Sequence, residues 1–156
     1  IVQISSGNSA IYDNVDQDSS KGVEFEFTHQ LTTAWLWRTT YTQFFESPAL
    51  SFRESERVAS LMVNFQQANW NGNLFVNYQS KKSVPAFDNN GERIDLDGYW
   101  QAAVKLRYYL ASSFQVFAQA KNLLDKAYFT PAATNKLTQD TANRGQEILV
   151  GIEFEF

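Results

Sequence analysis

Four glutamates could carry out chemistry because they occur as two pairs at i, i+2 spacing, Glu24 with Glu26 and Glu153 with Glu155. Two neighbouring carboxylates can act as a general acid and base or help to hold a metal ion. The single histidine, His29, has no second metal ligand nearby, and the sequence contains no cysteine. We therefore expect His29 to be a turn residue, and we predict no catalytic residues, no metal site, no cofactor and no enzymatic activity.

Apolar and polar residues alternate around these glutamates. The segment GVEFEFTHQL places Val23, Phe25 and Phe27 on one face, with Glu24 and Glu26 on the other. The last nine residues, ILVGIEFEF, alternate in the same way. A period of two is that of a β-strand, whose successive side chains point to opposite faces. The paired glutamates are therefore expected on the polar faces of strands.

Basic residues occupy equivalent positions in other alternating segments. Lys105 and Arg107 each stand between apolar residues, and Lys121 alternates with Ala118 and Ala120, so we expect all three on the same polar face as the glutamates. The interiors of outer-membrane barrels are polar and contain both signs of charge. A network of charges on a barrel wall explains the paired glutamates better than a catalytic site does.

The alternation recurs along most of the chain and predicts an all-β fold of about eight antiparallel strands. Short connections alternate with long polar ones, an arrangement typical of an up-and-down transmembrane β-barrel. No apolar run approaches the roughly 18 residues of a spanning helix, whereas a spanning strand needs only about 9 to 11. The strands are expected at about residues 1–5, 11–28, 33–45, 57–67, 72–82, 98–110, 113–128 and 144–156.

One hairpin register can be predicted from residue parity. If Ala111 to Ser113 form a three-residue loop, Leu110 faces Phe114 and Leu106 faces Ala118. Both pairs then lie on the apolar face.

Composition excludes one class of partner. The formal net charge is −4, and lysines and arginines are not clustered, so nucleic-acid binding is not expected. The first residue is Ile1, which indicates a chain that is processed or cut from a longer sequence.

The last third of the chain resembles the end of a TonB-dependent outer-membrane receptor. The resemblance is carried by LDGYWQAAVKLRYYLASSFQVFAQAKNLLDKAYFTPA, followed by NRGQEILVGIEFEF. Within it, the family motif corresponds to Asn122, Leu123, Asp125, Lys126 and Tyr128. The earlier segment NVDQDSSKGVEFEFTHQL is similar to a family strand that contains Gly-x-Glu.

The resemblance implies that residues 1–156 are the C-terminal part of a barrel of about 22 strands, located in the outer membrane of a Gram-negative bacterium. Such receptors import ferric siderophores or similar scarce nutrients and are energised through TonB. The plug domain that contacts TonB is absent from this sequence. The implied partners are the plug and the other barrel strands, the TonB complex, outer-membrane lipid, the barrel assembly machinery and a small ligand such as a ferric siderophore.

The final strand resembles the signal that the barrel assembly machinery reads. That signal is a glycine followed at fixed spacing by two hydrophobic residues, the last of them aromatic and C-terminal. Gly151, Phe154 and Phe156 fit it. The resemblance thus implies that the chain ends on an assembly signal.

Aromatic residues near the predicted strand ends have two interpretations. Trp and Tyr favour the depth of lipid headgroups, so these residues are expected to anchor the barrel at the membrane interface. The alternative is that some of them stack on a flat ligand at the outer loops. The candidates for ligand binding are Tyr99, Trp100, Tyr128 and Phe129.

Two other functions remain open from the sequence. A complete eight-stranded outer-membrane barrel, acting as an adhesin or a narrow pore, is permitted by the strand count. A soluble eight-stranded ligand-binding barrel of lipocalin type would need an apolar interior rather than one lined by Glu, Lys and Asn.

Overall fold

The computed structural model describes residues 2–6, 9–13, 19–46, 54–87, 93–130 and 141–155. Within these ranges it contains β-strands and no helix, and every strand pairing is antiparallel. None of the described residues forms a helix long and apolar enough to cross a membrane. The predicted all-β, antiparallel fold class is confirmed.

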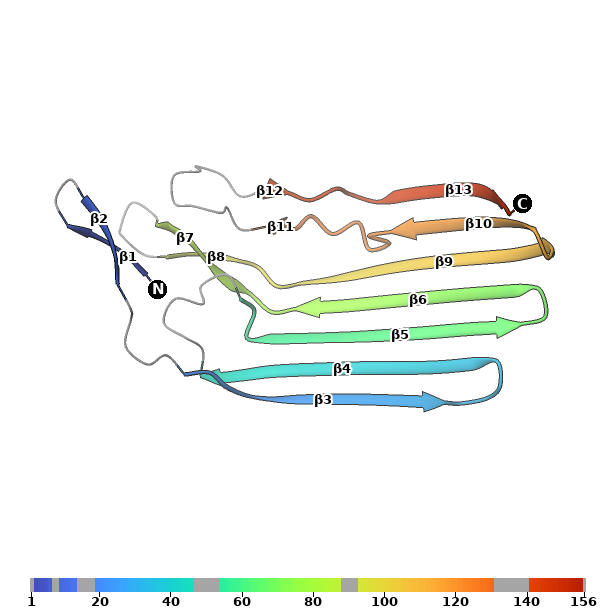
Figure 1. Ribbon diagram of the computed structural model, residues 1–156, viewed down its shortest axis with the longest axis horizontal. Coiled ribbons are helices and arrows are strands. Elements are labelled where there is room, and N and C mark those ends of the chain that lie inside the picture. The colour runs from blue at the N-terminus through green and yellow to red at the C-terminus, as the bar shows by residue number, and fades with distance from the viewer. Residues whose placement is uncertain are drawn as a thin grey trace.

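The main element is a single seven-stranded sheet in the order β13-β10-β9-β6-β5-β4-β3, whose strands lie side by side (Figure 1). The sheet is open, because in the described part of the chain β3 pairs only with β4 and β13 only with β10. Its strands are β3 (Lys21–Gln30), β4 (Trp35–Glu46), β5 (Arg57–Gln67), β6 (Trp70–Gln79), β9 (Tyr99–Ala111), β10 (Phe114–Lys121) and β13 (Glu147–Phe154).

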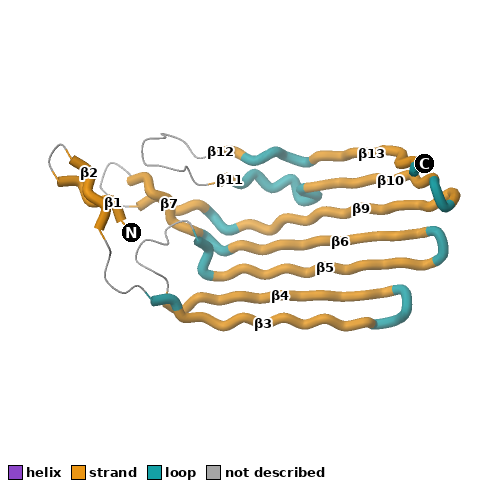
Figure 2. The backbone as a smooth tube through the Cα atoms, in the orientation of Figure 1, coloured by secondary structure: helices purple, strands orange, loops and turns teal. Residues whose placement is uncertain are grey.

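Three two-stranded hairpins lie beyond one end of this sheet, opposite the tight turns (Figures 1 and 2). They are formed by β1 (Val2–Ser6) with β2 (Ser9–Asp13), β7 (Lys82–Phe87) with β8 (Arg93–Leu96), and β11 (Phe129–Thr130) with β12 (Thr141–Ala142). The described connections thus sort into short ones at one end of the sheet and structured, longer ones at the other.

The start of the chain differs from the prediction of strands at 1–5 and 11–28. β2 pairs back on β1, with Ile4 opposite Ile11 and Ser6 opposite Ser9, and the main sheet begins only at Lys21. The physical reason is visible in the sequence, because a Gly-Asn pair separates the two strands and favours a tight hairpin turn. In the described part of the chain the main sheet therefore has seven strands rather than the eight expected.

The predicted strand at 113–128 is also shorter, because β10 ends at Lys121. Asn122 has a φ of 48° and Asp125 a φ of 47°. Residues in this left-handed region cannot continue a strand, and Asn and Asp tolerate it better than other non-glycine residues. The chain therefore leaves the ladder immediately after β10.

The hairpin between β9 and β10 confirms one predicted pair and contradicts the other. Leu106 lies opposite Ala118 as expected, but Phe114 lies opposite Ala111, and the register then shifts so that Gln115 faces Tyr109. The turn is shorter than predicted, and the extra residue is accommodated as a β-bulge in β9.

The main sheet buries very few of the described side chains. Ala102 is the one buried hydrophobic residue among those described, at 8% exposure, whereas Ile148 and Val150 are each 73% exposed. The described residues form no second layer over the sheet, so its burial has to come from its surroundings. The registers place the alternating apolar residues of all seven strands on one side, the apolar face, and the polar ones on the other, the polar face.

Candidate functional site

The apolar face carries pairs of aromatic residues at two levels. Trp70 and Tyr108 are cross-strand partners near the tight turns, with ring centroids 4.7 Å apart. Tyr78 and Trp100 are partners at the opposite end of the same strands, 4.8 Å apart. Two further pairs lie at the turn end: Trp35 with Phe65 at 4.6 Å, and Phe114 with Phe154 at 6.3 Å.

The spacing of the two aromatic levels matches a bilayer. Trp70 and Tyr78 are eight residues apart on β6, which corresponds to about 26 Å along a strand. With the tilt of about 40° usual in outer-membrane barrels, this length spans roughly 20 Å of depth, close to the apolar band of about 25 Å. The aromatic pairs therefore have the spacing expected of the two aromatic girdles that flank the apolar band of such barrels.

The polar face carries the charged residues that the sequence assigned to it, but in the described part of the chain no ion pair joins the paired glutamates to Lys105, Arg107 or Lys121. Glu26 forms an ion pair with Arg38 at 2.9 Å. Near the turns, Gln115 Nε2 donates a hydrogen bond to Glu153, and Lys105 Nζ lies 4.6 Å from the centre of the Phe117 ring. Glu26 and Glu153 thus each have a polar partner on this face. Among the described residues no group of three or more acidic, His or Cys side chains could hold a metal ion.

His29 is not the turn residue that the sequence predicted. It is the penultimate residue of β3, opposite Trp37, and its ring stacks on Phe27 with centroids 5.9 Å apart. His29 is two residues after Phe27 in the strand, so the alternation places both side chains on the apolar face.

Two of the ligand candidates meet on the polar face, at the end of the sheet that carries the hairpins. The rings of Tyr99 and Tyr128 stack with centroids 4.5 Å apart and planes 23° apart. Gln101 Nε2 donates a hydrogen bond to the Tyr128 hydroxyl at 2.9 Å. Gln101 was not among the predicted site residues, although a residue two positions after Tyr99 in a strand has to share its face.

A hollow of about 240 Å³ opens beside this tyrosine pair. Phe129, another ligand candidate, also lines it and is 45% exposed. Trp100 does not belong to this group, because consecutive residues of a strand alternate and its ring packs against Tyr78 on the apolar face. The remaining lining residues are Asp95, Leu96, Asp97, Gly98, Lys126 and Ala127.

Asp95 of the β7–β8 hairpin lines the hollow and forms hydrogen bonds with two neighbouring side chains. Its carboxylate accepts hydrogen bonds from Ser83 Oγ at 2.6 Å and from Lys81 Nζ at 3.0 Å. Both hydrogen bonds lower the pKa of Asp95, and the one from Ser83 is the larger cause. The hydrogen bond between Lys81 and Asp95 in turn raises the pKa of Lys81. The pKa of Lys82 is lowered by burial. The Asp95 carboxylate is therefore held ionised beside the hollow.

The motif that begins at Asn122 forms a structural latch. Asn122 is 2% exposed, and its Oδ1 accepts a hydrogen bond from the Lys126 amide at 3.1 Å. Its Nδ2 donates to the carbonyls of Lys126 at 3.1 Å and Arg144 at 3.3 Å. The next residue, Leu123, donates its amide to the Ala102 carbonyl of β9 at 2.9 Å.

The second half of the latch fastens the approach to β13. Asp125 Oδ1 accepts a hydrogen bond from the Gln146 amide at 3.2 Å, and Gln146 Nε2 donates to the Leu123 carbonyl at 3.4 Å. A Cβ added at Gly145 would lie 3.3 Å from Asp125 Oδ1, so a larger residue there would crowd the carboxylate. The motif therefore joins β9, β10 and the start of β13.

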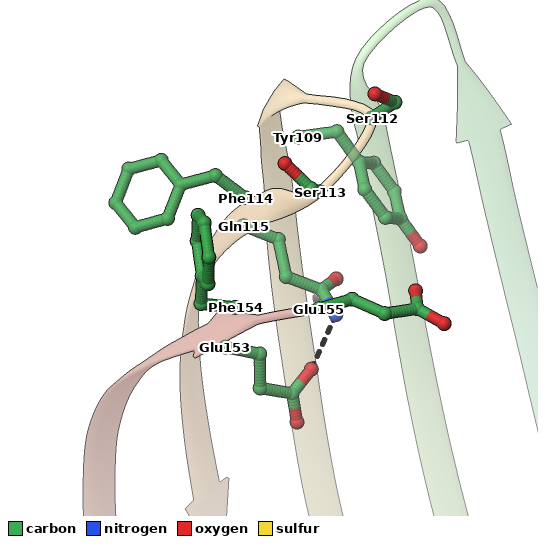
Figure 3. Close-up of a pocket in the computed structure, with 8 residues that line it drawn as sticks. All are labelled: Tyr109, Ser112, Ser113, Phe114, Gln115, Glu153, Phe154 and Glu155. Atoms are coloured by element: carbon green, nitrogen blue, oxygen red, sulfur yellow. Dashed lines mark hydrogen bonds between the residues drawn. The ribbon is translucent and has the colours of Figure 1, made fainter.

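Two residues of the expected assembly signal lie on opposite faces of β13. Figure 3 shows Phe154 of β13 beside Phe114 of β10 on one face of the sheet, while Glu153 and Gln115 point to the other face. Gly151 is covered on the polar face by its cross-strand partner Phe117, whose ring would lie 2.6 Å from an added Cβ. Phe156, the third residue of the signal, lies outside the described residues.

Comparison with known proteins identifies relatives at the level of sequence family and fold. A family model described as "TonB dependent receptor-like, beta-barrel" matches residues 1–123. A search of curated proteins finds no match.

Solved structures match over most of this chain. The ferripyoverdine receptor of the outer membrane of Pseudomonas aeruginosa matches 88% of the chain with a TM-score of 0.74 and 18% identity. The ferric-catecholate import receptor Fiu of E. coli K12 matches 88% with a TM-score of 0.72 and 18% identity. A mutant of the ferric enterobactin receptor PfeA of P. aeruginosa matches 99% with a TM-score of 0.74 and 18% identity.

The chain corresponds to only part of each of these proteins. It covers 19% of the ferripyoverdine receptor, 21% of Fiu and 26% of PfeA. At these identities the structural likeness establishes the fold, an open section of a much larger barrel wall.

Proposed function

This chain belongs to the TonB-dependent receptor β-barrel family, and we propose that it is the C-terminal part of the barrel of a receptor that imports a ferric siderophore or a similar scarce nutrient. The observation that carries the proposal is the family match over residues 1–123 on an open, two-faced sheet. The matched solved structures are transport receptors rather than enzymes, and the first is an outer-membrane protein. We therefore assign this chain to the outer membrane of a Gram-negative bacterium.

The open sheet supports a role as a section of wall. An isolated β13 or β3 edge would expose unpaired backbone groups, which have no water to bind inside a bilayer. Further strands at both edges satisfy these groups in a barrel of about 22 strands. Neither eight-stranded alternative accounts for a sheet whose edge strands do not meet in the described part of the chain.

The two faces define the partners. Outer-membrane lipid covers the apolar face between the aromatic girdles, and the polar face lines the lumen, where a plug domain from the same receptor is seated. Energy for transport comes from the TonB complex through that plug. The barrel assembly machinery recognises the last strand through Gly151, Phe154 and Phe156.

The ligand binds at the hollow formed by Tyr99, Tyr128 and Phe129. Stacked and exposed aromatic rings offer flat surfaces to a planar group of the ligand, and Lys126 lines the same hollow with a positive charge. Trp100 faces lipid instead and anchors the outer girdle with Tyr78.

Uptake of radiolabelled ferric siderophores by the full-length receptor tests the function. Cells that lack their own receptors are given a panel of ferric siderophores, with and without TonB. We expect binding of one chelate in both strains and its uptake only when TonB is present. Uptake of no ferric chelate, or uptake independent of TonB, would contradict the proposal.

Matched tyrosine variants test the site. Tyr99→Ala or Tyr128→Ala should weaken binding of the transported chelate roughly threefold to tenfold through loss of one stacked ring. Tyr78→Ala is the control, because it removes the same side chain at similar depth from the opposite face. Equal effects of the three substitutions would exclude the hollow as the binding site.

A further inference from the structure

Basic side chains descend the polar face along β9 and β10. Lys105 lies opposite Gln119, and Arg107 lies opposite Phe117. Lys121 is two residues beyond Gln119 on β10, away from the tight turn, so the three cations occupy levels that are two residues apart. A strand rises about 3.3 Å per residue, so successive levels are about 7 Å apart. We call Lys121, Lys105 and Arg107 the cation column.

The outer end of the cation column adjoins the proposed ligand site. Tyr128 lines both the hollow at Tyr99 and a second hollow of about 270 Å³, which Lys121 also lines. Gln101 Nε2 donates to the Tyr128 hydroxyl oxygen, so the hydroxyl proton is left to donate to another group. The ammonium and the hydroxyl thus bring two donors to the second hollow, which suits an anionic acceptor.

The cross-strand neighbours of the cation column have their acceptors engaged. Glu147, opposite Lys121, forms an ion pair with Arg144 at 2.9 Å. Asn71 and Asn73 face the other two cations from β6. The side-chain oxygen of each asparagine accepts a hydrogen bond from a neighbouring asparagine amide. The neighbouring strands therefore leave the column without a counter-charge.

The cation column differs in this respect from other charges of the polar face. Within the described residues none of its members forms an ion pair, and Arg107 Nε has no hydrogen-bond partner. Lys105 Nζ rests over the Phe117 ring, a contact that does not cancel its charge. Arg38, by contrast, is paired with Glu26. Like charges repel one another, so an anion that enters the column is attracted by all of its members.

We propose that the cation column guides an anionic group of the transported chelate from the hollow beside Tyr99 and Tyr128 down the barrel wall. This inference rests on the proposed function and adds the charge class of the substrate, a ferric chelate with carboxylate, catecholate or similar anionic oxygens. Steps of about 7 Å are shorter than the screening length of about 8 Å, so an anion leaving one cation already lies in the field of the next. Single cations that face water bind an anion weakly, and weak binding at several sites is what passage requires.

The test compares binding with uptake in the full-length receptor. Binding of the transported ferric chelate is measured in cells without TonB, and its maximal uptake rate in cells with TonB. Lys105→Gln combined with Arg107→Gln should lower the maximal uptake rate of an anionic chelate roughly tenfold, about threefold for each charge. The dissociation constant should stay within about twofold, because both substitutions lie below the hollow.

Control variants separate guidance from packing. Arg38→Gln removes a cation of the same face that is already paired with Glu26, and it should leave the uptake rate unchanged. Lys105→Arg and Arg107→Lys retain the charge and should keep the rate near that of the unsubstituted receptor. Heat-modifiable migration of each variant checks that the barrel is folded.

Several outcomes would overturn the cation column while the proposed function stands. One is a transported chelate that is electrically neutral or cationic, and another is an unchanged uptake rate in the double glutamine variant. An equal loss in Arg38→Gln or in the charge-retaining variants would also overturn it, because the missing charges would not be the cause. Import of no ferric chelate would overturn both proposals.

Discussion

Replacement of Asn122 should open the latch between β10 and β13. The side chain is 2% exposed and takes part in three hydrogen bonds, to the Lys126 amide and to the carbonyls of Lys126 and Arg144. Each such bond contributes about 1 kcal/mol net, so Asn122→Ala loses about 3 kcal/mol through these contacts. The φ of 48° adds a further cost to alanine, of about 1 kcal/mol, because Ala tolerates the left-handed region less well than Asn.

Asn122→Gly separates the two contributions. Glycine loses the same three hydrogen bonds but adopts a positive φ without a steric penalty. We therefore expect Asn122→Gly to open the latch less than Asn122→Ala, by about 1 kcal/mol. Leu124→Ala is the control within the same turn, because Leu124 is 57% exposed and its truncation should change stability by less than about 0.5 kcal/mol.

Amide hydrogen exchange of Leu123 in the membrane-embedded receptor measures this opening. The Leu123 amide donates to the Ala102 carbonyl, a bond that no Asn122 variant removes directly. A loss of about 3 to 4 kcal/mol of local stability accelerates its exchange roughly 100-fold to 1,000-fold, up to the limit set by global unfolding. Exchange in Asn122→Ala no faster than in Leu124→Ala would refute the latch, and equal exchange in the alanine and glycine variants would refute the contribution of backbone strain.

Two further predictions concern β13 and the β7–β8 hairpin. Gly151→Ala should slow barrel assembly, because the new Cβ would lie 2.6 Å from the Phe117 ring. The assembly rate is measured as the rate at which heat-modifiable receptor appears. Adding Phe117→Ala to the Gly151→Ala chain should restore that rate. The β7–β8 hairpin should loosen in acid, measured by protease cleavage, because Ser83 and Lys81 lower the pKa of Asp95. Stabilisation from a lowered carboxyl pKa is present above the ordinary value of about 4 and is lost as the pH falls through the lowered pKa.

Controls for these two predictions use the same positions. If Phe117→Ala fails to restore assembly of the Gly151→Ala chain, the defect does not come from the ring contact. Asp95→Asn should make cleavage of the hairpin insensitive to pH between about 2 and 6, since the titrating group is gone. A persisting acid transition in that variant would assign the effect to another group.

The regular part of the fold could be predicted because alternation is a local property. Glu26, Lys105 and Glu153 share the polar face because each stands between apolar neighbours in its own strand. The pairing of Leu106 with Ala118 follows from the same parity, whereas the β-bulge in β9, opposite Phe114 and Gln115, depends on turn geometry that parity does not encode. Register near a turn therefore needs information that a period-two pattern lacks.

The faces of the candidate residues on β9 were predictable from the sequence, but the contact between Tyr99 and Tyr128 was not. Alternation within β9 places Trp100 in phase with Val104 and Leu106 on the apolar face, which leaves Tyr99 on the polar face. Tyr128 reaches Tyr99 only because the chain turns back after β10, through the left-handed Asn122. A strand continued from 113 to 128, as the alternation alone predicted, places Tyr128 far from this position.

The break at Asn122 also explains how β10 and the segment that follows it are held together without a hydrophobic core. The single-layer sheet buries almost no apolar residue, so hydrophobic packing within the described chain cannot fix the path beyond β10. Backbone groups released from the ladder need partners at once, and Asn122 supplies them from a side chain that both donates and accepts. Because its second donor bond reaches Arg144, the same side chain also sets where β13 begins. The position of the hollow beside Tyr99 and Tyr128 and the start of β13 therefore depend on one side-chain amide, so we expect loss of that amide to alter both.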